Sequence, residues 1–381
     1  MTTYLLSPFS NNYLGNAMFD GPTGTLRDLM AERGISMCTV DLGDIRSADR
    51  ILFYDLNREL LLKCLAAGVT PDRLVLFLFE PEVTRPDQYN PRVWQHFGTI
   101  FTSRDDLVDN VRFFKLKWPQ IMRRLSSLPG FEERKLAAMI NSNKFSYVDG
   151  EGFTYRRKAI RFFDSVDDFD LYGPNWNDNA LTRQQAIYAL KQALISKTTR
   201  NGSKLTLWRA GSTALLSPKM IASYFRDILG GWRPFRSYIG TVPDKDETLS
   251  HYRFCLCYEN QFNRPGYMTE KIFDCFVSGT IPIYLGATNV DEYVPRSAFI
   301  WMKDIPDFSA LHTFMKSMTS AEFNKMQRAG QEFLDSEAFG AWTPKGSFND
   351  IIAKLLWDTP AVGANLVFAC ESGPREAAGC L

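Results

Sequence analysis

Residues 252–286 read YRFCLCYENQFNRPGYMTEKIFDCFVSGTIPIYLG, and this stretch decides the fold. Tyr252–Tyr258 is apolar and aromatic almost throughout, which predicts a strand buried on both faces. A polar loop with Asn, Gly and Pro follows, and Thr269 can then cap a short helix. Ile281–Leu285 predicts the next buried strand. The stretch therefore predicts a β-loop-α-β unit, the building block of a parallel sheet.

The charges at the start of this helix break a local rule. Glu270 suits the positive end of the helix dipole, but Lys271 beside it does not. A cation among free backbone N–H groups makes sense where an anion docks. Lys271 is therefore a candidate anion ligand. The alternative, that its side chain simply points into water, stays open on the local pattern alone.

Four short motifs occur in and just after this unit. Tyr258–Asn260 reads YEN, Tyr267–Lys271 reads YMTEK, and Gly279–Gly286 reads GTIPIYLG. Together they resemble the signature of the family 10 α-1,3/4-fucosyltransferases, FEN…Y-V-T-E-K…G-x-(I/V)-P-(I/V)-x-x-G. Pro295–Ile300, PRSAFI, continues the resemblance where the family has P-x-S-F-I. Several rigidly spaced elements make this signal far more specific than a lone glycine motif.

Strand and helix signals alternate along the chain before this unit as well. Apolar runs such as Arg50–Tyr54 and Leu74–Phe79 are separated by helical segments, which predicts an α/β, doubly wound, Rossmann-like domain. The resemblance implies the GT-B fold, in which two such domains face a central cleft. The expected segments are an acceptor-side domain over 1–130, a GDP-sugar-binding domain over 131–345, and a helix with a partly disordered tail over 346–381.

Composition excludes several classes of protein. With 381 residues, 45% hydrophobic content and a formal net charge of +1, the chain is expected to be soluble, without the basic excess of a nucleic-acid binder. The sequence shows no signal peptide and no apolar run long enough to span a membrane, unlike the anchored Golgi members of the family. We expect a cytoplasmic enzyme of bacterial type, and peripheral association with the inner membrane stays open. The alternative is a chain trimmed of its anchor. The oligomeric state stays open.

Sugar transfer from a nucleotide diphosphate requires cationic groups for the leaving diphosphate. Lys271 is the first candidate and Arg236 the second, because family members carry an arginine about one loop upstream of the central strand. Arg233 is the close competitor of Arg236. The resemblance also implies four donor-side residues: Asn260, Tyr267, Thr269 and Glu270. Of these, the Glu270 carboxylate would accept hydrogen bonds from the ribose hydroxyls.

Two further elements are weaker candidates. Asn141–Asn143 ends the first strand of the second domain and resembles the S-N-C-N element of the family without its cysteine. It is expected either to contact phosphate or to cap the following helix. Asn12 and Asn16 resemble an acceptor-side loop of bacterial members.

The acceptor hydroxyl needs a base. Glu80 follows the apolar run Leu74–Phe79, so it is expected at the carboxyl end of a strand, facing the cleft. Family members place a glutamate after this strand, and Glu80 is our candidate; Glu82, on the same side of an extended chain, is the alternative. One direct displacement inverts the anomeric configuration, so β-linked GDP-fucose would give an α-fucoside.

Metal-binding patterns are weak in this sequence. Asp168–Asp170 and Asp244–Asp246 have the D-x-D form of metal-dependent transferases, which chance often produces. Cys255 and Cys257 fall within a strand and are expected to be buried core thiols. We therefore expect no metal site and no required cofactor, while stimulation by a divalent cation stays open.

The resulting hypothesis is an inverting transferase that moves L-fucose from GDP-fucose to a glycan hydroxyl in α-1,3 or α-1,4 linkage. The expected acceptor is a bacterial surface polysaccharide or the GlcNAc of a LacNAc-like glycan. Two alternatives remain: the same scaffold with another GDP-sugar, and a non-catalytic glycan-binding relative.

Overall fold

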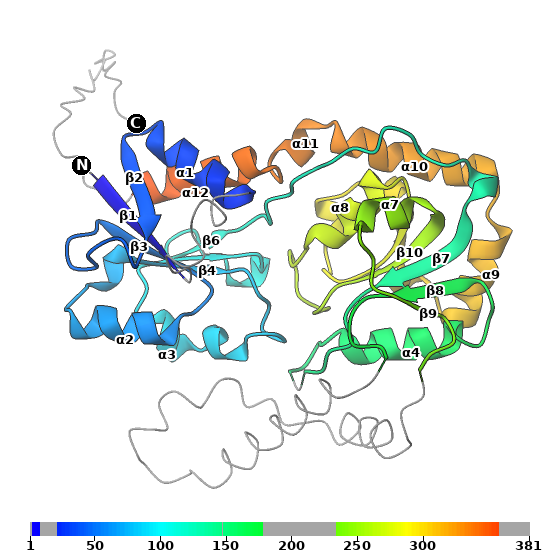
Figure 1. The fold of residues 1–381 in the computed structure, drawn as a ribbon, viewed down its shortest axis with the longest axis horizontal. Coiled ribbons are helices and arrows are strands. Elements are labelled where there is room, and N and C mark those ends of the chain that lie inside the picture. The colour runs from blue at the N-terminus through cyan, green and yellow to red at the C-terminus, as the bar shows by residue number, and fades with distance from the viewer. Residues whose placement is uncertain (1, 8–20, 147, 178–233, 358–381) are drawn as a thin grey trace, which may run out of the picture.

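The computed structural model describes residues 2–7, 21–146, 148–177 and 234–357. Within these residues the chain forms two six-stranded sheets, and every strand pair in both is parallel. Figure 1 shows the two sheets side by side, each with its own helices. The predicted α/β architecture with two Rossmann-like sheets is confirmed.

The first sheet has the order β2-β1-β3-β4-β5-β6. β4 is buried at every residue, and its side chains divide between two cores: Val75 and Phe77 face one, Leu74, Leu76 and Leu78 the other. This alternation is the two-residue period of a strand covered on both faces. The elements are β1 (Thr2–Ser7), β2 (Ile35–Thr39), β3 (Arg50–Tyr54), β4 (Leu74–Leu78), β5 (Thr99–Thr102) and β6 (Phe113–Lys115), with α1 (Pro22–Ala31), α2 (Arg58–Ala66) and α3 (Pro91–Trp94).

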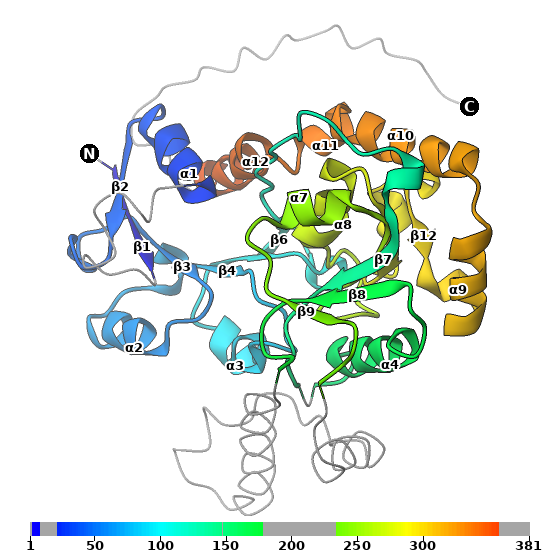
Figure 2. The same cartoon turned by 45° about the vertical axis from the view of Figure 1, so that its right-hand side comes forward.

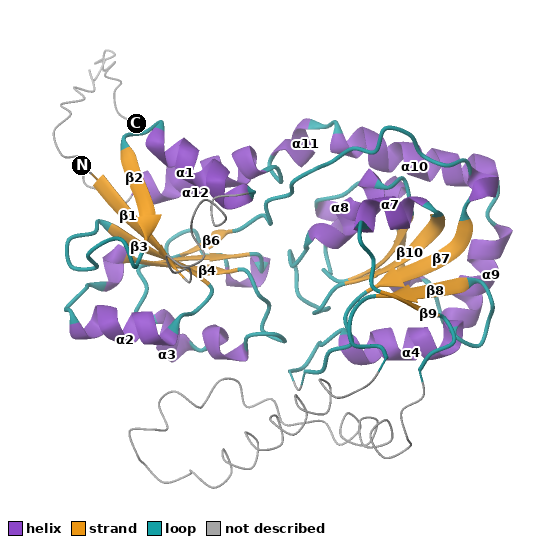
Figure 3. Cartoon of the chain, in the orientation of Figure 1, coloured by secondary structure: helices purple, strands orange, loops and turns teal. Residues whose placement is uncertain are grey.

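The second sheet has the order β12-β11-β10-β7-β8-β9, so its strand order reverses between β7 and β10. Ligands of open parallel sheets bind beyond the carboxyl ends of the strands at such a reversal. Figure 3 shows the sheet between α7 and α8 on one side and α4 on the other. Its strands are β7 (Lys135–Ile140), β8 (Phe169–Tyr172), β9 (Tyr238–Gly240), β10 (Tyr252–Tyr258), β11 (Ile281–Leu285) and β12 (Ile300–Trp301). Its helices are α4 (Phe153–Phe163), α7 (Lys245–Ser250), α8 (Glu270–Val277), α9 (Phe308–Ser317) and α10 (Ser320–Leu334).

The β10-α8-β11 unit has the predicted form. Both strands have the predicted bounds, and α8 buries Ile272, Phe273 and Phe276 on one side. Gly279 follows the helix with a φ of 63°, a left-handed conformation that glycine adopts without steric cost.

The C-terminal part of the described chain returns to the first sheet. After α11 (Glu337–Gly340), α12 (Pro344–Trp357) lies beside α1, as Figures 1 and 2 show from two directions. Phe348 and Leu355 of α12 join Leu26 and Met30 of α1 in one core cluster. α12 thus begins at Pro344 and packs its apolar side against α1. The first sheet depends on residues from both ends of the sequence.

Some expectations concern residues that the structure does not describe. Residues 358–381, which include most of the expected tail, lie outside the described residues. None of the described helices combines the length and the apolar character needed to cross a membrane.

Two neighbouring leucines test the packing of α12. Leu355 is 1% exposed and Leu356 is 37% exposed. We expect Leu355→Ala to lower the free energy of unfolding by about 2–5 kcal/mol, because it leaves a cavity against α1. Leu356→Ala, the matched control, should change it by no more than about 0.5 kcal/mol. Chemical denaturation measures both, and equal losses would contradict this packing.

Candidate active site

A buried carboxylate fixes the loop between β10 and α8. Glu259 follows the last residue of β10 and is fully buried. Its Oε1 accepts the backbone N–H of Thr269 at 2.8 Å, and its Oε2 accepts the Thr269 hydroxyl at 2.8 Å. The Nζ of Lys271 lies 3.1 Å from the same Oε2. A buried charge requires such partners. Glu259 therefore ties the start of α8 to the end of β10.

Lys271 is held at the N-terminus of α8. Its Nζ donates to the Thr269 hydroxyl at 2.7 Å and lies 3.3 Å from a Glu270 oxygen, and its side chain is only 16% exposed. Burial lowers the pKa of Lys271, but Glu259 and Glu270 outweigh burial and raise it. The ammonium therefore stays charged beside the first-turn N–H groups, which have no acceptors within the helix. The alternative of a lysine pointing into water is wrong.

Glu270 stays ionised beside two cations. Burial raises the pKa of its carboxyl, but Lys271 and Lys245 outweigh this and bring the pKa to about 2. Lys245, at the start of α7, has its Nζ 4.0 Å from a Glu270 oxygen and forms an ion pair with Asp274. The Glu270 side chain is 38% exposed, so a ligand can reach it.

Two other donor-side candidates lie deeper in this loop. The Asn260 Oδ1 accepts a hydrogen bond from the buried guanidinium of Arg156 at 2.9 Å, and Arg156 also donates to the Tyr258 carbonyl. Burial lowers the pKa of Arg156 to about 10, and nearby carboxylates including Glu259 only partly offset this. Tyr267 is 1% exposed, and its hydroxyl has no hydrogen-bond partner in the described structure. An unsatisfied buried hydroxyl is uncommon, which makes it a candidate ligand contact.

Asn141 and Asn143 lie at the carboxyl end of β7 and support the neighbouring loop. The Asn143 Nδ2 donates to the Asn175 carbonyl at 3.0 Å, and the indole of Trp176 donates to the Asn141 carbonyl. The Asn143 Oδ1 is buried without a partner among the described residues. Neither asparagine caps α4, which begins only at Phe153.

Glu80 lies at the carboxyl end of β4 with its backbone fixed on both sides. Its N–H donates to the Asp55 Oδ1 at 2.9 Å, and its carbonyl accepts the Gln88 Nε2 at 2.8 Å and the Tyr89 hydroxyl at 3.2 Å. Burial and the Asp55 carboxylate raise the pKa of Glu80, while Lys144 and Lys271 act in the opposite direction. Lys144 follows β7 and Lys271 lies in α8, so both cations that act on Glu80 belong to the second sheet and its helices.

Glu82 is engaged in ion pairs. Its Oε2 lies 3.3 Å from Arg104 and 3.8 Å from Arg264, and its side chain is only 13% exposed. The Glu82 carboxylate is therefore held between the guanidinium groups of Arg104 and Arg264. Of the two candidate bases, the geometry favours Glu80.

The structure does not bring every candidate to this edge. Arg236 precedes β9, and its guanidinium donates to the Asp164 carbonyl just after α4, at 2.6 Å. Because the strands are parallel, this is the amino edge of the sheet, opposite Glu259 and Lys271. Arg233, Asn12 and Asn16 lie outside the described residues.

Sequence reasoning missed three supporting residues. Asp55, with a φ of 59°, follows β3, and a carboxylate directly after a strand was the available signal. Lys245 lies within a D-x-D pattern that we considered only for metal binding. Arg156, on α4, stood out in the sequence only as a basic residue near the Asn141–Asn143 loop, and its buried hydrogen bond to Asn260 had no local signal. Among the described residues, no three His, Cys, Asp or Glu side chains gather as a metal site requires.

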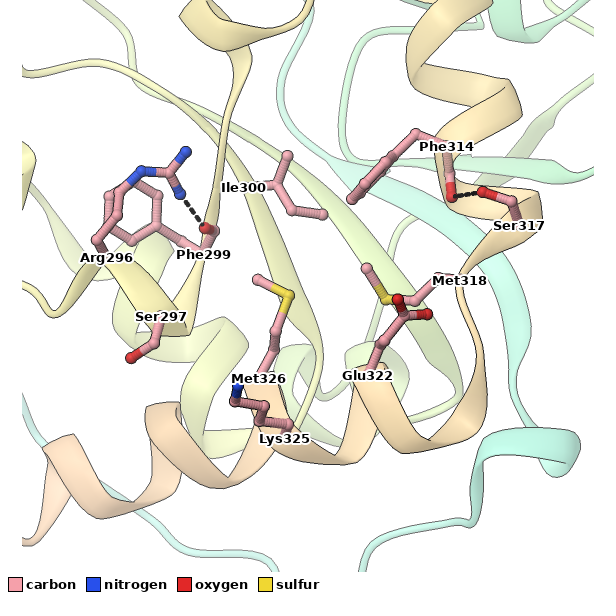
Figure 4. Close-up of a pocket in the computed structure, with 10 residues that line it drawn as sticks. All are labelled: Arg296, Ser297, Phe299, Ile300, Phe314, Ser317, Met318, Glu322, Lys325 and Met326. Atoms are coloured by element: carbon pink, nitrogen blue, oxygen red, sulfur yellow. Dashed lines mark hydrogen bonds between the residues drawn. The ribbon is translucent and has the colours of Figure 1, made fainter.

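A hollow of about 390 Å³ lies elsewhere, at the amino end of β12 between α9 and α10. Figure 4 shows Phe314, Met318 and Met326 lining it, with Arg296 at one side. It contains none of the predicted site residues.

Solved structures share this architecture. An α1,3-fucosyltransferase solved with GDP and with GDP-fucose matches with TM-scores of 0.53 and 0.51 at 15% identity, over 94% of this chain and 91% of that chain. At this identity the likeness concerns the fold. Together with the two parallel sheets, it confirms the predicted GT-B fold.

A family model matches the segment that carries Glu259 and Lys271. Residues 235–327 match the C-terminal domain of glycosyltransferase family 10 (fucosyltransferase). The α-(1,3)-fucosyltransferase of Helicobacter pylori is 36% identical over 103 residues, 25% of this chain and 21% of that protein. The human 4-galactosyl-N-acetylglucosaminide 3-α-L-fucosyltransferase 9 is 33% identical over 81 residues, 20% of this chain and 22% of that protein. The match thus spans about a fifth of the length of these relatives. The resemblance to family 10 is confirmed over this segment, which includes Glu259 and Lys271.

Replacement of the central carboxylate tests the site. We expect Glu259→Gln to lower the free energy of unfolding by about 3–5 kcal/mol, because it leaves the buried Lys271 without its full counter-charge. Glu247→Gln is the matched control at a side chain that is 59% exposed, with an expected change within about 0.5 kcal/mol. Both are measured by chemical denaturation. A Glu259→Gln protein as stable as the control would contradict the central role of this carboxylate.

Proposed function

We propose that this chain is an inverting fucosyltransferase that moves L-fucose from GDP-fucose to a glycan hydroxyl in α-1,3 or α-1,4 linkage. The observation that carries the proposal is the electrostatic effect of Lys271, which lies in the segment that matches the family 10 model, on the Glu80 carboxyl after β4. A proton acceptor on one sheet would then face a cationic helix N-terminus on the other.

On the donor side, Lys271 and the first-turn N–H groups of α8 would hold the diphosphate. Both the ammonium and the dipole of the helix favour negative charge at this point, and they would stabilise the charge that develops as GDP leaves. Glu270, ionised and partly exposed, would accept hydrogen bonds from the ribose hydroxyls. Asn260, Tyr267 and the Asn143 Oδ1 would contact the sugar or the phosphates.

On the acceptor side, Glu80 would act as the general base. As the acceptor oxygen forms its bond to the anomeric carbon, its proton passes to the Glu80 carboxylate, and the bond from that carbon to the diphosphate breaks. Attack opposite the leaving group inverts the configuration, so a β-linked donor gives an α-fucoside. A raised pKa makes Glu80 a stronger base than an exposed glutamate.

The remaining parts of the proposal follow the resemblance. Cations and N–H groups would neutralise the diphosphate, so no metal is required in this scheme, although a divalent cation could still stimulate product release. The acceptor would be a bacterial surface polysaccharide or a LacNAc-like glycan, and the location cytoplasmic.

Donor titration tests the proposal. We expect calorimetry in the presence of EDTA to show binding of GDP-fucose and none of UDP-galactose. Lys271→Ala should weaken GDP binding about tenfold or more, because one charge-assisted contact is worth about 1.5–3 kcal/mol. Equal binding of GDP-mannose would favour another GDP-sugar, since ribose and phosphate contacts are common to all of them. No binding of any of these donors, with or without a divalent cation, would contradict the proposal.

The base makes a separate prediction. Glu80→Gln should abolish transfer but leave GDP binding largely intact, because the amide keeps the shape and cannot take the proton. In the wild type, the carboxylate loses activity when it is protonated, so kcat/KM should fall on the acid side. Because the pKa of Glu80 is raised, this fall should lie above the pH range of an ordinary glutamate, about 4.3. Asp55→Asn should move it to lower pH. Retained turnover in Glu80→Gln would contradict the assignment.

A further inference from the structure

One cluster of charges joins the two sheets and has no role in the proposal above. Asp105 lies directly beyond β5 of the first sheet, and its backbone N–H donates to the carbonyl of Pro265 at 3.0 Å. Pro265 belongs to the loop between β10 and α8. The first sheet therefore contacts the same loop that carries Tyr267 and leads to Lys271.

The Asp105 carboxylate forms three more bonds at this contact. Its Oδ1 accepts the Nζ of Lys115 at 2.6 Å, and its Oδ2 accepts the Asn289 amide at 2.9 Å and the Tyr293 hydroxyl at 2.8 Å. Burial raises the pKa of Asp105, but hydrogen bonds from Asn289, Lys115 and Tyr293 outweigh burial and lower it. Asp105 is therefore ionised, and its hydrogen bonds are of the stronger, charge-assisted kind.

Gly266 completes the contact from the loop side. Its carbonyl accepts the Lys115 Nζ at 3.2 Å, and its N–H donates to the Asn289 Oδ1 at 2.7 Å. The φ of Gly266 is 73°, and a Cβ here would lie 2.3 Å from an Asp105 carboxylate oxygen. Only glycine allows the loop to approach the carboxylate this closely.

A second acidic residue of the first sheet acts on the neighbouring loop residue. Arg264 lies 3.8 Å from Glu82, which also pairs with Arg104 at 3.3 Å. Residues 264–266 thus meet fixed charges of the first sheet at two points. The base candidate Glu80 is anchored to that sheet as well, through the Asp55 carboxylate and Gln88.

We propose that Asp105 is a positioning residue, which clasps the loop at 264–266 and thereby sets the distance between the donor groups at the start of α8 and Glu80. The inference rests on the proposed function, because it takes Glu80 as the base. Loss of the clasp should misalign the two halves of the site. Misplacement of reacting groups by about 1 Å can reduce turnover about 100-fold. GDP binding, which uses groups of the second sheet alone, should persist.

The test compares Asp105→Ala with Tyr293→Phe, which removes one bond of the clasp, and with Asp109→Ala. Asp109 is the matched control, because among the described residues its carboxylate accepts backbone N–H groups of its own segment, at 111–113, and has no hydrogen bond or ion pair with the second sheet. Hydrogen exchange of the free protein over residues 262–268, calorimetry with GDP, and kcat for transfer are measured for each variant. For Asp105→Ala we expect faster exchange, a kcat about 10- to 100-fold lower, and a GDP Kd within about threefold of the wild type. The exchange rate and kcat of Tyr293→Phe should lie between those of Asp105→Ala and the wild type, and those of Asp109→Ala should lie near the wild type.

Unchanged exchange at 262–268 in Asp105→Ala would overturn the clasp. Faster exchange with an unchanged kcat in Asp105→Ala would overturn the positioning role. An equal loss of kcat in Asp109→Ala would overturn it too, because the loss would then reflect general destabilisation of the first sheet. The exchange and GDP measurements need no turnover. A failure of the proposed function would appear separately, as a wild type that does not bind GDP-fucose.

Discussion

The buried carboxylate of Glu259 accepts a backbone N–H, a hydroxyl and an ammonium, and the rest of the candidate site depends on these contacts. Without them, a fully buried negative charge at the end of β10 would be strongly unfavourable. With them, Thr269 is fixed at the N-cap of α8, directly before its first residue, and Lys271 is held beside the N–H groups of the first turn. One buried charge thus orders a second, partly buried charge of opposite sign. The attraction between the two charges and their hydrogen bonds offset the cost of desolvating both. The resulting geometry suits a negatively charged ligand.

The parallel sheets bring distant residues together. Every strand of a parallel sheet delivers its following loop to the same edge, so Glu259 after β10 and Asn143 after β7 lie at the same edge, where the strand order reverses. The first sheet presents Glu80 in the same way, after β4. The electrostatic effect of Lys144 and Lys271 on Glu80 links the two edges. Asp105, after β5, adds a direct contact between the first sheet and the β10-α8 loop.

Much of the fold could be predicted from the sequence, because strands buried on both faces are apolar runs with abrupt ends. β3, β10 and β11 have the predicted bounds for this reason. Lys271 beside Glu270, which stood out in the sequence, contacts Glu259, Thr269 and Glu270 in the structure. Arg236 could not be placed, because β9, which it precedes, is only three residues long and lacks the apolar run that marks the longer strands. The choice between Glu80 and Glu82 depended on Arg104 and Arg264, whose contacts with Glu82 have no local sequence signal.

We propose that a donor binds at the start of α8 with its anomeric carbon facing Glu80. A crystal structure of the Glu80→Gln protein with GDP-fucose is the most direct test. We expect diphosphate oxygens within hydrogen-bond distance of the Lys271 Nζ and of the first-turn N–H groups, with the sugar between them and the residue 80 side chain. A nucleotide bound elsewhere, or a diphosphate held without Lys271, would contradict it.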